Sequence, residues 1–91
     1  MTPPIEHLPE QGRFQTRVEG HLGVAEYRLA NGVMLMTHTE VHPALQGRGI
    51  AAALVDAALA HARANGLKVN PLCSYVRAHM RRNPQTQDLL A

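Results

Sequence analysis

The stretch VHPALQGRGIA, residues 41–51, leads from an apolar run into a helical pattern and carries two glycines one residue apart, Gly47 and Gly49. A glycine inside a helix costs about 1 kcal/mol relative to alanine, so two at a helix entry need a reason. A glycine-rich loop between a strand and a helix leaves backbone N–H groups pointing outward, with the positive end of the helix dipole behind them. This predicts a phosphate-binding loop; the alternative is a helix entry that merely needs a flexible backbone.

Regular elements are predicted on both sides of the loop. A helix runs from Gly47 or Arg48 to about Asn65, with Asn65-Gly66 as its C-cap. The residues that recur at helical spacing on its apolar face are Ile50, Leu54, Ala57, Ala58 and His61. After it come a fourth strand over residues 67–73 and a short helix over residues 74–82, with Ser74 as its N-cap.

Upstream of the loop, alternating apolar and polar residues predict strands over residues 13–18 and 24–30, and a methionine-rich run predicts a central strand over residues 33–41. Asn31-Gly32 joins the last two strands as a hairpin turn, because both residue types tolerate positive φ. The side chains expected to face inward are Phe14, Thr16, Val18, Ala25, Tyr27 and Leu29. These strands form an antiparallel meander, and the fold class is α/β (α+β).

Length and composition indicate one globular domain over residues 1–91, with an irregular lead-in over residues 1–10. A hydrophobic fraction of 45% excludes a disordered chain, and no apolar run reaches the length of a membrane span. The proline-rich N-terminus does not resemble a signal peptide. Cys73 is the only cysteine, so no internal disulfide forms, and a free thiol suits the reducing cytoplasm.

The number and distribution of charged residues indicate which kinds of binding partner the chain could have. A formal net charge of +2 is too small to imply nucleic-acid binding by bulk charge. The last third carries the basic residues Lys68, Arg77, Arg81 and Arg82 against one acid, Asp88, which suits a small polyanionic ligand or simply a solvated face. With one Phe, two Tyr and no Trp, stacking platforms for nucleic acid are scarce.

The sequence does not match either of two well-known phosphate-binding motifs. Residues 47–52 fit the dinucleotide pattern G-x-G-x-x-A, but that fingerprint needs a βαβ unit and an acid about 20 residues further on. Here the preceding strands are antiparallel, and Lys68 and Asn70 occupy the positions where that acid is expected. A Walker loop is excluded because no Gly-Lys-Ser/Thr follows.

The run Gln46-Gly47-Arg48-Gly49-Ile50-Ala51 resembles the signature Q/R-x-x-G-x-G/A of the GNAT superfamily of acetyl-CoA N-acetyltransferases. Residues 23–27, the HTEV of residues 38–41 and the PLCSYV of residues 71–76 also resemble a small single-domain subfamily with HTxV and PxCSYV segments. The resemblance covers nearly the whole chain after the first few residues. The chain lacks the N-terminal helices and final strand pair that build the acceptor pocket in full-length members.

This resemblance implies a GNAT-like fold, with a three-strand meander and a fourth strand that diverges from the third to admit coenzyme A. It implies acetyl-CoA as cofactor and acetyl transfer to an amine of a small molecule or a protein. The residues implied to bind the cofactor are Gln46, Gly47, Arg48, Gly49, Ile50 and Ala51 at the pyrophosphate, and Glu40 and Val41 at the pantetheine amides.

Cys73 is the first candidate for the chemistry. It lies where the fourth strand meets the last helix, so the helix N-terminus, with Lys68, Arg77 or Arg81 nearby, would lower its pKa and make it nucleophilic. The alternative is a small buried apolar residue. The resemblance favours a functional thiol near the coenzyme A sulfur.

His38 and Tyr75 are the other candidates. His38 is expected to share a strand face with Met34, Met36 and Glu40, and imidazole could take the proton of the amine; the alternative is a packing residue. Tyr75 is held in reserve, because the family commonly uses a tyrosine of the last helix to protonate the leaving thiolate. His42, His61 and His79 are expected at structural or surface positions, and the spacing of the six histidines predicts no metal site.

Three classes of function follow. The first is acetyl transfer from acetyl-CoA to an amine, directly or through an acetyl-Cys73 intermediate. The second is a coenzyme A sensor or adaptor that never turns over, since the usual acceptor pocket is missing. The third, a nucleic-acid adaptor, rests only on Arg77, Arg81 and Arg82 and ranks last.

Overall fold

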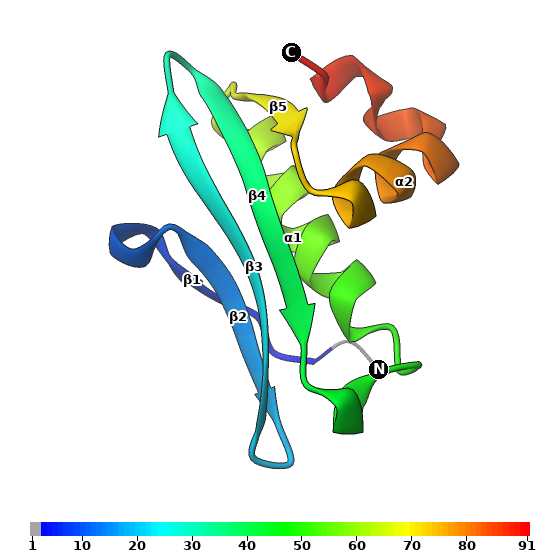
Figure 1. The fold of residues 1–91 in the computed structure, drawn as a ribbon. Helices are drawn as coiled ribbons and strands as arrows, with labels where there is room; N and C mark the ends of the chain where they lie inside the picture. Colours follow the sequence, from blue (N-terminus) through cyan, green and yellow to red (C-terminus); the bar gives the residue numbers. More distant parts are fainter. Residues whose placement is uncertain (1–2) are drawn as a thin grey trace.

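A computed structural model describes residues 3–91. Five strands form one sheet in the order β1-β2-β3-β4-β5, with α1 packed across it and α2 beside β5 (Figure 1). The strands are β1 (Glu6–Leu8), β2 (Arg13–Val18), β3 (His21–Ala30), β4 (Val33–Val41) and β5 (Lys68–Pro71). The helices are α1 (Ile50–Ala64) and α2 (Ser74–Arg82), with short 3-10 helices η1 (Pro9–Gln11), η2 (Pro43–Leu45) and η3 (Pro84–Leu89). The mixed α+β class is confirmed.

The predicted meander is also confirmed, since β2, β3 and β4 pair antiparallel in sequence order. Asn31 and Gly32, at φ values of 52° and 78°, make the turn between β3 and β4. β5 then pairs parallel to β4, because the chain returns through α1 before it rejoins the sheet. The last pair of strands is therefore parallel in an otherwise antiparallel sheet.

The lead-in predicted as irregular contains a strand. Glu6 pairs with Gln15 and Leu8 with Arg13, so β1 extends the sheet beyond β2. Prolines on both sides limit β1 to three residues and hide its pattern in the sequence. Residues 1–2 of the predicted lead-in lie outside the described residues.

The core lies between the sheet and the helices. Of the α1 face predicted from the sequence, Ile50, Leu54 and Ala58 are buried, whereas Ala57 and His61 are only half-buried. The residues of α1 that are buried but were not predicted are Val55, Leu59 and Ala62. The buried stripe is wider than one face because α2 and η3 also pack against α1.

Leu29 does not face a core as predicted, and its side chain is 58% exposed. β2 pairs with β3 only as far as Glu26, so the end of the β3–β4 hairpin has no neighbouring strand on that side. Alternation alone does not reveal where a neighbouring strand ends.

An aromatic cluster attaches β1 to the rest of the fold. The His7 ring stacks on Phe14 at a centroid distance of 4.1 Å, and its Nε2 is hydrogen-bonded to the Tyr27 hydroxyl. The His61 ring meets the His7 ring edge-on, with 4.4 Å between the two centroids. Burial and, to a smaller degree, the neighbouring His61 lower the pKa of His7 from its ordinary value of 6.5.

We therefore expect stability to depend on pH through His7. A lowered pKa means that the folded state favours neutral His7, so its contribution is present above pH 6.5 and is lost as pH falls through the lowered value. Urea unfolding of His7→Gln at neutral and acidic pH should show a weaker loss of stability on acidification than the parent. His38→Gln, at an exposed histidine, is the control for replacing an imidazole by an amide. An unchanged slope in His7→Gln would contradict this assignment.

Candidate functional site

The loop from β4 to α1 is built around two fixed points. The Nδ1 atom of His42 accepts the Ala44 N–H at 3.0 Å and caps η2. Leu45, at the end of η2, is fully buried in the core. These contacts hold the chain before Gln46, so the glycine loop that follows starts from a rigid base.

Gly47 and Gly49 both have left-handed backbones, at φ values of 80° and 76°, and Gly49 is the N-cap of α1. Such φ values favour glycine, and a Cβ atom at either position would meet no atom within 4 Å. The space beside both glycines is therefore open. The first hydrogen bond of α1 runs from the Ala53 N–H to the Gly49 carbonyl at 3.0 Å.

The backbone N–H groups of residues 47–52 have no hydrogen-bond partner among residues 3–91. They belong to the glycine loop and to the first turn of α1, where the helix dipole is positive. Unpaired N–H groups, the positive helix end and open space at two glycines together fit a phosphate group. The arrangement lies in the loop for which the sequence predicts phosphate binding, and it is here called the cradle.

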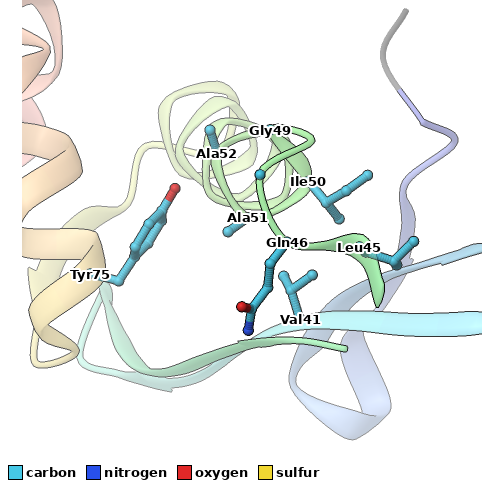
Figure 2. Close-up of a pocket in the computed structure, with 9 residues that line it drawn as sticks. Val41, Leu45, Gln46, Gly49, Ile50, Ala51, Ala52 and Tyr75 are labelled. Atoms are coloured by element: carbon cyan, nitrogen blue, oxygen red, sulfur yellow. The ribbon is translucent and has the colours of Figure 1, made fainter. Parts of the chain in front are cut away.

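A hollow of about 280 Å³ adjoins the cradle. Figure 2 shows the Tyr75 ring of α2 on one side of the hollow and the first turn of α1 on the other. The residues that line it are Val41, Leu45, Gln46, Gly47, Gly49, Ile50, Ala51, Ala52 and Tyr75. Six of these are predicted cofactor-binding residues, and Tyr75 is the tyrosine held in reserve. Leu45 and Ala52 were not predicted, because only the folded loop brings them to the hollow.

The Arg48 side chain, in contrast, turns to the hairpin between β2 and β3. Its two terminal nitrogens donate to the two Glu19 oxygens at 3.1 and 3.3 Å. These hydrogen bonds, and then the charge of Arg48, lower the pKa of Glu19. Both side chains are largely exposed, so the pair contributes little to stability. Arg48 offers its backbone N–H to the cradle, while its guanidinium is held by Glu19.

A β-bulge in β4 corrects the face predicted for His38. Glu26 pairs with His38 but Tyr27 pairs with Met36, so Thr37 is an extra residue in β4. The extra residue reverses the alternation, and Thr39 rather than His38 falls on the face of buried Met36. The prediction that His38 and Glu40 share the face of Met34 and Met36 is wrong. They lie on the outer face, joined by a contact of 3.0 Å from His38 Nε2 to Glu40 Oε1.

Beyond the bulge, the edge of β4 that faces β5 is open. β5 pairs with β4 only from Val33 to Met36, and the Cys73 N–H then donates to the Met36 carbonyl at 2.9 Å. From this point β4 and the segment that follows β5 separate, as predicted for the third and fourth strands of the sequence.

The direction of the β4 backbone groups tests the predicted pantetheine contacts. The His42 N–H donates to the Leu22 carbonyl of β3. Backbone groups of alternate residues point the same way, so those of Glu40 also face β3, while those of Thr39 and Val41 face the open edge. Val41 therefore fits the predicted role, whereas the Glu40 backbone is used within the sheet. Thr39 was missed because the bulge is not visible in the sequence.

Cys73 lies where β4 and the chain after β5 separate. It is the N-cap of α2, one residue before the predicted cap Ser74, and its thiol is half-buried. Its Sγ lies 3.7 Å from Thr39 Oγ1. The position joins the open edge of β4 to the N-terminus of α2.

The surroundings of the Cys73 thiol favour its ionised form. Burial acts to raise its pKa, but the Val76 N–H, the Thr39 hydroxyl and then the N–H groups of Tyr75 and Thr39 lower it by more. The net pKa is lowered, so thiolate is more abundant at neutral pH than for an ordinary cysteine. The groups responsible are helix N–H groups and Thr39, in place of the basic side chains suggested by the sequence.

Among residues 3–91, no helix has the length and apolar character that crossing a membrane requires.

Comparison with known proteins gives the family of this fold and loop. The family model of the GCN5-related N-acetyltransferases matches residues 13–89. The chain belongs to this family. The match covers the meander, the cradle, both helices and η3, so the resemblance inferred from the sequence is confirmed.

Relatives and a solved structure agree with this GNAT assignment. Protein NATD1 of Mus musculus is 34% identical over 89 residues, a span of 93% of this chain and 80% of the mouse protein. Protein NATD1 of Xenopus tropicalis is 33% identical, over 93% of this chain and 81% of its own. A GCN5-like protein of Staphylococcus aureus, solved by NMR, superposes with a TM-score of 0.78 at 26% identity, covering 99% of this chain and 89% of its own. The GNAT-like fold is therefore shown along nearly the whole chain.

Proposed function

We propose that this GNAT protein binds acetyl-CoA along the cradle and the open edge of β4, and transfers the acetyl group to an amine. The observation that carries the proposal is the set of unpaired N–H groups at residues 47–52, beside two glycines with open space. These groups suit a pyrophosphate, because they supply donors and a positive dipole without any side chain in the way. Membership of the family supports acetyl-CoA as the donor.

Different parts of the chain are proposed to bind different parts of acetyl-CoA. The cradle holds the pyrophosphate, and the Val41 backbone groups and the Thr39 carbonyl pair with the pantetheine amides as a short added strand. Tyr75 and the first turn of α1 enclose the hollow between them. Acetyl-CoA supplies a thioester, whose carbonyl carbon accepts a nucleophile.

Two routes are compatible with the position of Cys73. In the direct route, a neutral amine attacks the thioester, and donors beside Cys73, such as the Thr39 hydroxyl, stabilise the developing negative charge. In the second route, the Cys73 thiolate takes the acetyl group first and passes it to the amine. The lowered pKa of Cys73 and its half-buried thiol at the open edge of β4 support the second route. A reducing compartment such as the cytoplasm would keep that thiol free.

The acceptor is proposed to be an amine of a small molecule or of a protein. The outer sheet face with His38 and Glu40 is covered by no helix among residues 3–91. The second candidate function is a coenzyme A sensor that does not turn over. Nucleic acid is not proposed as a partner.

Calorimetry with coenzyme A tests the proposal directly. We expect saturable binding, and no binding at millimolar coenzyme A would overturn both candidate functions. Incubation with labelled acetyl-CoA and a panel of primary amines then separates them. Amide product or acetylated Cys73 supports the acetyltransferase, whereas tight binding with neither product supports the sensor.

A further inference from the structure

A buried histidine connects the two helices that border the hollow. His79 of α2 was expected at a structural or surface position, and its side chain is only 7% exposed. Its Nε2 lies 2.7 Å from Oδ1 of Asp56 on α1. A carboxylate only accepts hydrogen bonds, so the His79 Nε2–H donates to Asp56. The pair therefore ties α2 to α1, the helix that begins at the cradle.

Tyr75 lies one helical turn before His79 on α2. The two rings are stacked, with centroids 6.2 Å apart and planes 23° from parallel. Tyr75 lines the hollow, and Figure 2 shows its ring directed toward the first turn of α1. His79 thus packs behind the one aromatic side chain that lines the hollow, with Asp56 fixing the His79 ring in turn.

We propose that Asp56 and His79 are positioning residues for acetyl transfer: they hold the Tyr75 ring beside the hollow, where its hydroxyl would protonate the departing thiolate, the role that the family resemblance implies for this tyrosine. This inference rests on the proposed function. In the step, the new bond to the carbonyl carbon forms as its C–S bond breaks, and the sulfur leaves with the electron pair. The Tyr75 O–H bond gives its proton to that sulfur, and the tyrosinate regains a proton from solvent, which takes up the proton lost by the amine.

The electrostatics around Tyr75 agree with a proton donor. Burial raises its pKa, Arg82 on α2 lowers it, and Asp56 raises it again, with a net increase. His79, whose ring stacks on Tyr75, is a further titratable group in contact with this side chain. The phenol is therefore protonated at neutral pH, which is the form that can donate a proton.

The chain is suited to a spectroscopic test because it has two tyrosines and no tryptophan. Labelling the tyrosine ζ-carbons gives two NMR signals, whose pH titrations report Tyr27 and Tyr75 separately without coenzyme A. We expect Asp56→Asn to lower the pKa of Tyr75 and to leave that of Tyr27 unchanged. Glu10→Gln, at an exposed acid in η1, is the control and should move neither. Asp56 is itself exposed, so the variant should fold.

Transfer and binding measurements complete the test. With acetyl-CoA and an amine accepted by the parent, Asp56→Asn should lower kcat about tenfold, because His79 loses its carboxylate partner and the Tyr75 ring is held less firmly. KM for acetyl-CoA should stay within a few-fold, because the cradle is unchanged. His79→Gln, whose amide can still donate to Asp56, should retain more turnover than His79→Ala. Tyr75 titrations that are identical in Asp56→Asn and Glu10→Gln would overturn this inference alone. A parent protein that fails to bind coenzyme A or to turn over would overturn the proposed transferase and the inference with it.

Discussion

Replacing Gly49 by valine is expected to lower affinity for coenzyme A about 100-fold, or about 2.8 kcal/mol at ~1.4 kcal/mol per tenfold change. Gly49 has a φ of 76°, and open space lies where its Cβ would be. A valine would fill the space that the pyrophosphate needs, and its branched side chain disfavours this backbone. Calorimetry with coenzyme A measures the loss, and thermal unfolding shows whether the fold persists.

The matched control is Gly66→Val. Gly66 has a similar φ of 68° and equally open surroundings, but it follows the C-terminus of α1, at the far end from the cradle. Both variants should lose a similar amount of stability, about 1–2 kcal/mol for a left-handed side chain. Only the Gly49 variant should lose coenzyme A. Equal affinity in the two variants would mean that the phosphate does not lie at Gly49.

Much of the fold is predictable from the sequence because its signals are local. The period of two in β2 and β3, the Asn31-Gly32 turn and the helical period of α1 need only neighbouring residues. The glycines of the cradle are local as well, since Gly47 and Gly49 serve the backbone of their own loop. The glycine pattern alone therefore predicts the loop between β4 and α1 as a binding loop.

The parts that were missed depend on residues far apart in the chain. The bulge at Thr37 arises from the pairing of β4 with β3, and nothing in VMLMTHTEV signals it. One extra residue moves His38 to the outer face and brings Thr39 to Cys73, 34 positions away. His79 likewise finds its partner Asp56 across 23 positions. Alternation predicts a face only while the register is regular, so the side chains of the site could not be placed from the sequence.

Cys73 should react with an alkylating reagent faster at neutral pH than an ordinary cysteine. Its lowered pKa increases the thiolate fraction, so the rate should reach half of its maximum at a lower pH than for a free thiol. Cys73 is the only cysteine, which makes the rate of alkylation an unambiguous reading of this site. Mass spectrometry across a pH series measures it.

A pair of threonine variants tests the cause of this reactivity. Thr39→Val removes a hydroxyl that lowers the pKa of Cys73, so alkylation at neutral pH should slow and its pH profile should move upward. Thr37→Val is the control, because the Thr37 hydroxyl donates to the Glu26 carbonyl within the bulge. Equal rates in the two variants would show that Thr39 does not set the pKa of the thiol.

Saturating coenzyme A should protect Cys73 from alkylation, because the sulfur of the cofactor would occupy the space beside the thiol. Cys73→Ser should keep coenzyme A affinity within a few-fold, since the cradle is expected to supply most of the contacts. Its effect on transfer separates the two routes. A serine hydroxyl stays protonated at neutral pH, so an acetyl-cysteine route should lose at least about 100-fold in kcat, whereas direct transfer should change only mildly. A thiol alkylated at the same rate with and without saturating coenzyme A would remove Cys73 from the reaction and leave only the direct route, with Tyr75 as its acid.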